Sequence, residues 1–437
     1  MLTIDLLIHA RWIIPVEPAG LVEHHCLAIH EGRILDLLPS TAATDLYQAS
    51  QSIILAEHAL IPGLINAHTH AAMCLLRGLA DDRPLMEWLN EHIWPAENTW
   101  VNADFVRDGT ELAVAEMLRG GTTCFNEMYF FPDVAARVAF NTGMRANIGL
   151  ILFDFPTAWA NGPDEYLSKG LEVHDSYRDN PLVTTSFAPH APYTVSDAPL
   201  EKLRTYAEEL DMQIHMHVHE TADEVRQSFE HYHERPLARL HRLALISPRL
   251  QAVHMTQLTE AEIAMFAAAG GHVLHCPESN LKLASGFCPV DKLVKAGVNV
   301  ALGTDGAASN NDLDMFSEMR SAALLAKAVA NDATSIPAAM ALRMATLNGA
   351  RALGIDEVTG SLLPGKAADI TAVHLAGIES EPVYDPISQL VYATGRNQVT
   401  DVWVAGQHLL SNRVLTQMDE RATLAKAREW GRKIRKN

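Results

Sequence analysis

The feature that most constrains the fold is a regular alternation of short apolar runs and longer helical patterns between residues 60 and 306. Amphipathic stretches such as 104–118, 197–210 and 259–269 lie between eight apolar runs that have the length of buried strands. The eight runs are LIPGLINAH (60–68), GTTCFNE (121–127), MRANIGLIL (144–152), VTTSFAPH (183–190), MQIHMHVHE (212–220), LQAVHMT (250–256), HVLHCPES (272–279) and VNVALGTDG (298–306). This pattern predicts an α/β protein with a (β/α)8 barrel of the TIM type, whose active site lies at the carboxyl ends of the strands.

The two ends of the chain have a different sequence pattern, which predicts short strands and tight turns. Residues 4–60 contain apolar runs around a Glu31-Gly32 turn, and the region after Pro364-Gly365 contains runs around Ala405-Gly406. Isolated hairpins are only marginally stable, so we predict that both ends build one small β-sandwich domain. Its predicted residues are 1–60 and 361–437, beside a barrel of residues 61–360, and the stretch 420–437 predicts a docked amphipathic helix.

Composition limits the partners of the chain. Its 34 Lys and Arg against 53 Asp and Glu give a formal net charge of −19, which disfavours nucleic acid and anionic membranes as partners. Five cysteines without a CxxC pair argue against both a disulfide framework and a thiolate zinc site. We see no export signal and no apolar run long enough to span a membrane, and therefore expect a globular cytoplasmic protein.

Several of the 21 histidines fall near the ends of predicted strands. His68 and His70 follow the first apolar run, and residues two apart on a strand point to the same side. Both imidazoles can therefore converge on one point in the barrel mouth. The fifth run has histidines at the same spacing followed by Glu220, and its deeper His215 is predicted to be a hydrogen-bonded core residue.

Two later strands also end in polar side chains. The sixth run ends near His254, and the eighth ends with Asp305 between two glycines. Asp305 on its own would be interpreted as a helix cap or a turn residue. Together with the histidines it predicts a metal site instead, because imidazole and carboxylate ligands without thiolate suit zinc, with iron or manganese as alternatives.

The sequence resembles the amidohydrolase superfamily, within its cytosine deaminase and chlorohydrolase-like branch. The resemblance covers essentially the whole chain and is carried by PGLINAHTHAAMCLLRG, GTTCFNEMYF, FAPHAPYTVSD, HMHVHET, HCPESNLKLASG and GTDGAASNNDLDMFSEM. The run HTHAAMCLLRGLADDRPLMEWLNEHIWPAE is most similar to the 5-methylthioadenosine/S-adenosylhomocysteine deaminases. The resemblance implies hydrolytic deamination of small adenosine-type nucleosides with a 5′-thioether, one divalent metal ion per subunit, most simply Zn²⁺, and a homo-oligomer.

Catalytic roles follow from the same resemblance. The implied metal ligands are His68, His70, His217 and Asp305. Glu220 matches the catalytic glutamate, and His254 matches the histidine that contacts the attacking water. The chemistry agrees with these roles, because a carboxylic acid such as Glu220 can protonate the ring nitrogen beside the attacked carbon. Asp305 would take the proton of the water and pass it to the departing ammonia.

Substrate contacts are implied in the same way. The substrate-binding set is Glu97, His190, Glu220, Asp305 and Ser309. Glu97 would bind the ribose, because a carboxylate can accept hydrogen bonds from two neighbouring hydroxyls. His190 matches a further substrate-binding histidine, and Ser309 matches a serine near the purine.

The region that would surround the 5′ group departs from the family. Arg145 is a candidate match to a substrate arginine, but a second arginine that the family has shortly afterwards is missing. Phe153, Phe155 and Trp159 occur there instead, so the sequence leaves the shape of the 5′ pocket open.

Other functions remain open on the sequence. A guanine or 8-oxoguanine deaminase, or a triazine hydrolase, would have the same fold, although a base-only enzyme has no ribose for Glu97 to hold. A metal-dependent binding protein without catalysis is the alternative from another class. The presence of both Glu220 and Asp305 argues against that alternative.

Overall fold

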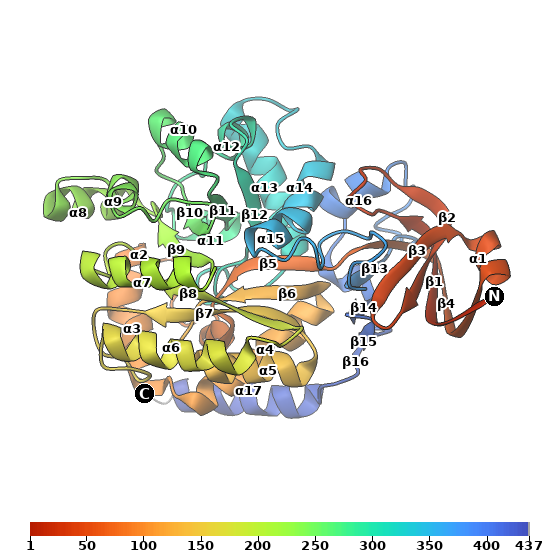
Figure 1. The fold of residues 1–437 in the computed structure, drawn as a ribbon, viewed down its shortest axis with the longest axis horizontal. Coiled ribbons are helices and arrows are strands. Elements are labelled where there is room, and N and C mark those ends of the chain that lie inside the picture. The colour runs from red at the N-terminus through yellow and green to blue at the C-terminus, as the bar shows by residue number, and fades with distance from the viewer. Residues whose placement is uncertain (436–437) are drawn as a thin grey trace.

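The computed structural model of the protein describes residues 1–435. Two sheets organise this part of the chain, a parallel sheet at the centre of the molecule and a mixed sheet at one end (Figure 1). The predicted α/β class and the predicted combination of a barrel with a small β domain are confirmed.

The central sheet is the predicted barrel. Its eight strands pair in parallel and follow one another in chain order. They are β5 (Leu64–Thr69), β6 (Thr122–Glu127), β7 (Arg145–Leu152), β8 (Val183–Pro189), β9 (Ile214–Val218), β10 (Leu250–His254), β11 (His272–His275) and β12 (Asn299–Leu302). The ring closes where Thr69 forms a parallel bridge with Asp305, just after β12. Each of the eight predicted runs coincides with one of these strands.

Helices surround the barrel and cover the apolar outer faces of its strands (Figure 1). They are α4 (Ala103–Arg119), α5 (Pro132–Thr142), α6 (Pro163–Tyr177), α7 (Asp197–Glu209), α8 (Ala222–Tyr232), α9 (Pro236–Arg242), α10 (Glu260–Ala269), α11 (Pro277–Lys282), α12 (Val290–Lys295), α13 (Met315–Ala330), α14 (Ala338–Met344) and α15 (Leu347–Ala352). The connection after β5 is broken into short pieces instead of one helix. These pieces are η1 (Ala71–Leu76), α2 (Leu85–Glu87), the π-helical turn η2 (Trp88–Ile93) and α3 (Trp94–Trp100).

The small domain uses strands from both ends of the chain, as predicted. Its eight strands form one mixed sheet in the order β16-β15-β14-β13-β4-β1-β2-β3. The elements are β1 (Leu2–Ile13), β2 (Val22–His30), β3 (Arg33–Pro39), α1 (Ser40–Leu46), β4 (Tyr47–Pro62), β13 (Ile370–His374), α16 (Pro386–Tyr392), η3 (Arg396–Gln398), β14 (Val399–Val404), β15 (Gln407–Ser411) and β16 (Val414–Leu415). The predicted turns at Glu31-Gly32 and Ala405-Gly406 join β2 to β3 and β14 to β15.

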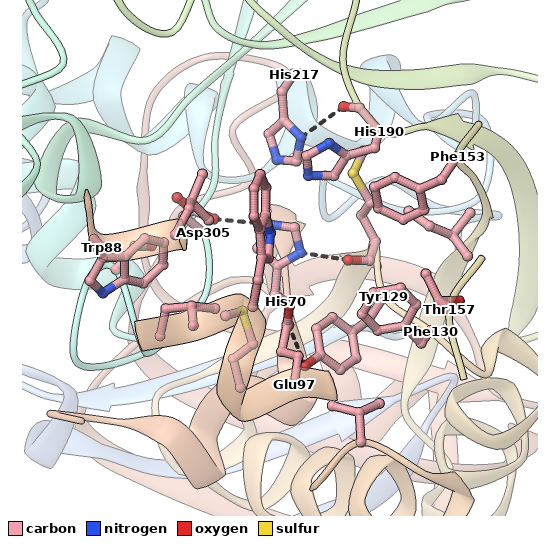
Figure 2. A pocket seen from close by; sticks show the side chains of 18 of the residues that line it. His70, Trp88, Glu97, Tyr129, Phe130, Phe153, Thr157, His190, His217 and Asp305 are labelled. Atoms are coloured by element: carbon pink, nitrogen blue, oxygen red, sulfur yellow. Dashed lines mark hydrogen bonds and ion pairs between the residues drawn. The ribbon is translucent and has the colours of Figure 1, made fainter. Parts of the chain in front are cut away.

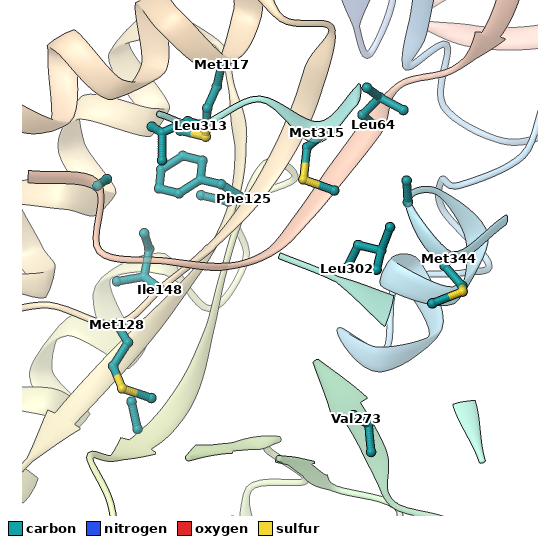
Figure 3. Close-up of a cluster of buried hydrophobic side chains, with 14 of the residues drawn as sticks. Leu64, Met117, Phe125, Met128, Ile148, Val273, Leu302, Leu313, Met315 and Met344 are labelled. Atoms are coloured by element: carbon teal, nitrogen blue, oxygen red, sulfur yellow. The ribbon is translucent and has the colours of Figure 1, made fainter. Parts of the chain in front are cut away.

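The core combines apolar packing with a buried polar network. Figure 3 shows part of the apolar cluster, which includes Leu64 of β5, Phe125 of β6 and Leu302 of β12. Amide and hydroxyl groups of β6, β7, β8 and β10 bond to one another, and the Asn147 amide donates to the Ser186 hydroxyl at 2.8 Å. Because buried polar groups are costly unless paired, this network fixes the relative position of the strands that carry the site.

The C-terminal helix α17 (Glu420–Arg435) docks on α4, in agreement with the predicted amphipathic helix. Its Trp430 is buried, and the indole nitrogen donates to Asp108 Oδ2 at 3.0 Å. The last two residues of the predicted stretch, 436 and 437, lie outside the described residues. Among the helices of residues 1–435, none is both long and apolar enough to cross a membrane.

Candidate functional site

Four side chains from strand ends meet at the carboxyl end of the barrel. They are the four predicted ligands, and one possible ligand atom of each lies within 4.8 Å of those of the others. Asp305 Oδ1 is 3.4 Å from Nε2 of His68 and 3.2 Å from Nε2 of His70. The Nε2 atoms of His68 and His217 are 3.1 Å apart. The structure thus brings together residues that are up to 237 positions apart in the sequence.

The other ring nitrogens of these histidines are already engaged. Nδ1 of His70 donates to the carbonyl of Met128, and Nδ1 of His217 donates to the carbonyl of His190 at 2.8 Å. A carbonyl can only accept, so each Nδ1 carries the hydrogen and each neutral ring presents a lone pair at Nε2. Lone pairs that converge beside a carboxylate repel one another unless a cation lies between them. The donor set of three imidazoles and one carboxylate therefore fits a divalent metal ion such as zinc.

The charge states agree with this fit. Burial lowers the pKa of His68 to about 4 and that of His217 well below its usual value, so both rings stay in the neutral form that binds metal. Burial opposes ionisation of Asp305, but hydrogen bonds from His68 and His70 hold its pKa well below the usual range. His70 is the exception: burial opposes its protonation, yet its hydrogen bond with Asp305 raises its pKa to about 9, so a metal ion would have to displace the proton at Nε2.

The backbone turns sharply where the functional strands end. His219, His254 and Asp305 all have left-handed backbone conformations, with φ of 54°, 73° and 63°. Non-glycine residues adopt this region only where surrounding contacts enforce it, and such residues cluster at functional sites. For Asp305 these contacts are a hydrogen bond from the Ser279 hydroxyl at 2.6 Å and one from the backbone of Gly306 at 2.8 Å.

Glu220 and His254 lie beside the metal ligands. Glu220 Oε2 is 3.8 Å from His254 Nε2, and the ring of His254 stacks on that of His217 with centroids 5.4 Å apart. Burial raises the pKa of Glu220, which allows this carboxyl to carry a proton. Nδ1 of His254 is 2.9 Å from Asn280 Oδ1, a contact that fixes the plane of the imidazole.

A cavity of about 570 Å³ opens above these groups (Figure 2). Its polar end contains His70, His217, Glu220, His254 and Asp305, and the rest of its lining is largely aromatic and aliphatic. The remaining predicted substrate residues, Glu97, His190 and Ser309, line the same cavity. Eight of the nine predicted site residues therefore border one space, and the ninth, His68, is fully buried beside it.

Glu97 and His190 both line this cavity, and His190 lies beside His217 whereas Glu97 lies nearer His70 (Figure 2). The hydroxyl of Tyr129 donates to Glu97 Oε1 at 2.7 Å, but burial outweighs that bond and raises the pKa of Glu97 to about 7. Burial lowers the pKa of His190 to about 3, so its ring is neutral near pH 7. The ring of His190 packs against Phe153, with centroids 4.8 Å apart.

Arg145 does not belong to the site, and its candidate match to a substrate arginine is wrong. It lies at the first residue of β7, at the opposite end of that strand from the cavity. Its guanidinium binds the carboxylate of Asp369 at 2.8 Å, and both side chains are buried. A buried arginine with a buried carboxylate partner has a structural role, because neither charge is free to bind a substrate.

Sequence reasoning missed a second set of polar residues that hold the site in place. Glu127, the last residue of β6, accepts from the hydroxyl of Thr69 at 2.6 Å and from the backbone of Ala71 at 3.0 Å. It thereby fixes the chain on both sides of His70. Ser279, Asn280 and Tyr129 contact Asp305, His254 and Glu97 as described above. The sequence offered one signal for these supporting residues, which is that each lies at or shortly after the end of a barrel strand.

Comparison with known proteins agrees with this geometry. Residues 59–409 match the model of the amidohydrolase family. A 5-methylthioadenosine/S-adenosylhomocysteine deaminase from Teredinibacter turnerae is 50% identical over 433 residues, which cover 99% of this chain and 98% of the relative. A protein of the same name from Saccharophagus degradans is 50% identical over 431 residues, which cover 98% and 97% of the two chains.

Solved structures are similar as well. The crystal structure of an adenosine deaminase from Xanthomonas campestris with bound zinc is 56% identical, covers 100% of both chains and has a TM-score of 0.99. An atrazine chlorohydrolase from Arthrobacter aurescens in complex with zinc is 22% identical, covers 97% of this chain and 99% of its own, and has a TM-score of 0.91. At that identity the second likeness concerns the fold alone.

Proposed function

Since the chain belongs to the amidohydrolase family, we propose that it is a zinc-dependent hydrolytic deaminase of adenosine-type nucleosides with a 5′-thioether. Its substrates are 5-methylthioadenosine and S-adenosylhomocysteine, which are named for relatives that are 50% identical over nearly the full length. The products are the corresponding inosine derivatives and ammonia.

The observation that carries this proposal is one cavity with three functional parts. The metal ligands and Glu220 lie at one end, Glu97 faces the same space, and an apolar aromatic lining surrounds the remainder. A purine with an amino group, a ribose diol and a thioether presents a matching group to each part. Tyr129 donates to Oε1 of Glu97, and a free base would leave the other carboxyl oxygen without the ribose hydroxyls that it can accept from.

His68, His70, His217 and Asp305 would hold the metal ion. Such an ion, when bound, lowers the pKa of water towards about 7, so a strong nucleophile is present at neutral pH. Zinc is supported by the donor set and by the zinc-bound structure that is 56% identical to this chain.

Side chains of the protein transfer the protons of the reaction. Glu220, whose pKa burial raises, acts as the acid and donates a proton to the ring nitrogen beside the attacked carbon, so charge does not accumulate there. Asp305, held ionised by its histidine neighbours, accepts a proton from the attacking water and delivers it to the amino group that leaves as ammonia. The remaining hydroxyl proton returns to Glu220, and the adduct becomes the inosine-type carbonyl.

Four residues position the attacking water and the substrate. His254 hydrogen-bonds the attacking oxygen through Nε2, which lies on the Glu220 side of its ring. Glu97 binds the two ribose hydroxyls. His190, neutral at pH 7, and Ser309 contact the purine.

The location and assembly of the enzyme are also proposals. We propose a cytoplasmic enzyme, because all five cysteines are free and buried, as expected for a protein that never needs disulfides. The homo-oligomer stays a prediction that analytical ultracentrifugation can check.

A panel of substrates tests the proposed function. Zinc-loaded protein is incubated with methylthioadenosine, S-adenosylhomocysteine, adenosine, guanine and atrazine. Ammonia and the adenine-to-hypoxanthine absorbance change report deamination, and chloride release reports hydrolysis of atrazine. We expect kcat/KM to be highest for the 5′-thioether nucleosides. No turnover of any adenosine derivative, or a preference for guanine or atrazine, would refute the proposal in favour of another amidohydrolase activity.

A further inference from the structure

One wall of the cavity is built from aromatic side chains that follow β7. Phe153 packs against His190 at the base end, and Phe155 packs against Phe153 with centroids 4.9 Å apart. Phe130, which follows β6, stacks on Phe153 with centroids 5.8 Å apart. Phe155 is 42% exposed, so this wall extends from the purine end of the cavity to its mouth. The wall consists of Phe130, Phe153, Phe155, Pro156, Thr157 and Ala158.

The cavity has no counter-ion for a carboxylate. Among the described side chains that line it, none is a lysine or an arginine, and the carboxyl groups are Glu97, Glu220 and Asp305. Lys169, the first basic residue that follows the wall in sequence, is bound to the carbonyl of Trp159 and to Glu165, at 2.6 Å in each case. Arg145 is bound to Asp369 at the other end of β7.

We infer that this aromatic wall selects nucleosides whose 5′-thioether bears an uncharged apolar group, and that S-adenosylhomocysteine is the poorer of the two proposed substrates. The inference rests on the proposed function and specifies its 5′ subsite. An alkyl group gains by leaving water for the wall, by a factor of about four in binding per buried methylene. The α-carboxylate of the homocysteine tail would instead lose hydration without a cation to replace it.

A matched pair of substrates tests this inference on the unmodified enzyme. 5′-Butylthio-5′-deoxyadenosine and its 5′-(3-carboxypropyl)thio analogue differ only by a methyl group in place of a carboxylate. We expect kcat/KM for the butyl compound to equal or exceed that for methylthioadenosine, and to exceed that for the carboxyl compound at least tenfold. S-adenosylhomocysteine should rank with the carboxyl compound. Values for the matched pair within threefold of each other would overturn the inference.

A variant on the wall tests its location. Ala158 is exposed at the mouth of the cavity, and Ala158→Arg adds the missing cation there, while Ala158→Gln adds a long side chain without charge. We expect the arginine variant to raise the ratio of carboxyl to butyl kcat/KM about tenfold and the glutamine variant to leave it unchanged. An unchanged ratio in both variants would contradict the assignment of this wall to the 5′ group.

Different results would refute the proposed deaminase function and the inference about the aromatic wall. If the enzyme turns over no 5′-substituted adenosine, the proposed function is wrong. If it turns over methylthioadenosine and S-adenosylhomocysteine with equal kcat/KM, the deaminase function stands and only the selection by the wall is wrong.

Discussion

Glu220 and Asp305 are two buried carboxyl groups at one site with opposite protonation preferences. Burial without a strong ion-pair partner raises the pKa of Glu220, whereas His68 and His70 hold that of Asp305 low. Two carboxyls whose surroundings separate their pKa values can serve as acid and base at the same pH. The acid role of Glu220 and the base role of Asp305 in the proposed mechanism follow from these contacts.

Replacing the proposed acid should stop turnover without loss of metal. We expect Glu220→Gln to lower kcat for methylthioadenosine by roughly 10² to 10⁴, the usual contribution of a general acid, while the bound zinc stays unchanged. Asp223→Asn is the matched control, because Asp223 lies three residues later and its carboxylate is exposed. Equal kcat in wild type and Glu220→Gln would remove Glu220 from the mechanism.

Glu97 should give the reaction a recognisable pH dependence. Its pKa is raised to about 7, so its carboxyl is largely protonated below that pH and ionised above it. The ionised form accepts hydrogen bonds from both ribose hydroxyls, so kcat/KM for methylthioadenosine should rise with pH through about 7. Glu97→Gln should remove this rise of kcat/KM with pH and lower kcat/KM. If kcat/KM of the variant still rises with pH through about 7, the rise belongs to the titration of another group.

The helices and strands that were predicted correctly from the sequence are those that a local pattern of residues encodes. The length and spacing of apolar runs were enough for all eight barrel strands. The position of polar residues at strand ends indicated a metal site, but the choice of His217 among the histidines of the fifth run came from the family resemblance. Thr259 caps α10 with a capping box, a pattern that Thr259 and Glu262 encode locally. At α7 the cap position is Ser196, and Asp197 is the first residue of the helix.

The parts that could not be predicted depend on contacts between distant segments. Arg145 in isolation has the same sequence signal whether it binds a substrate or a buried carboxylate 224 residues away. Residues 71–100 form short helical pieces whose boundaries follow from packing against the cavity and α4, and no sequence period marks them. The boundaries of the two domains, at residues 60 and 361, stay a prediction.

The C-terminal helix α17 contributes Trp430 to a buried cluster that packs against the lining of the cavity. Trp430 packs edge-on against Phe105 at 5.3 Å and belongs to the same buried cluster as Trp88, which lines the cavity. We expect Trp430→Ala to destabilise the fold by about 3 to 5 kcal/mol and to raise KM for methylthioadenosine. Trp430→Phe keeps most of the packing and loses only the bond to Asp108, so its thermal midpoint should fall less. Equal losses in both variants would show that the hydrogen bond dominates.

For the whole molecule, the barrel and the small domain are joined by a buried ion pair. Arg145 of β7 binds Asp369, the residue just before β13, at 2.8 Å. Breaking a buried pair leaves one charge uncompensated, so we expect Arg145→Ala to cost about 3 to 5 kcal/mol of stability. Differential scanning fluorimetry measures the loss, and the Arg145→Ala/Asp369→Ala double variant should recover part of it. A selective fall in kcat/KM for S-adenosylhomocysteine at an unchanged thermal midpoint would instead indicate substrate binding by Arg145.

The most direct measurement is a titration of metal-free protein with zinc, in which deamination of methylthioadenosine and bound metal are followed together. One site made of His68, His70, His217 and Asp305 predicts that ammonia release rises linearly to a plateau at one zinc per chain. His217→Ala should abolish both the binding and the activity. Deamination that is unaffected by removal of the metal, or no ammonia release at full zinc occupancy, would contradict a metal-dependent deaminase.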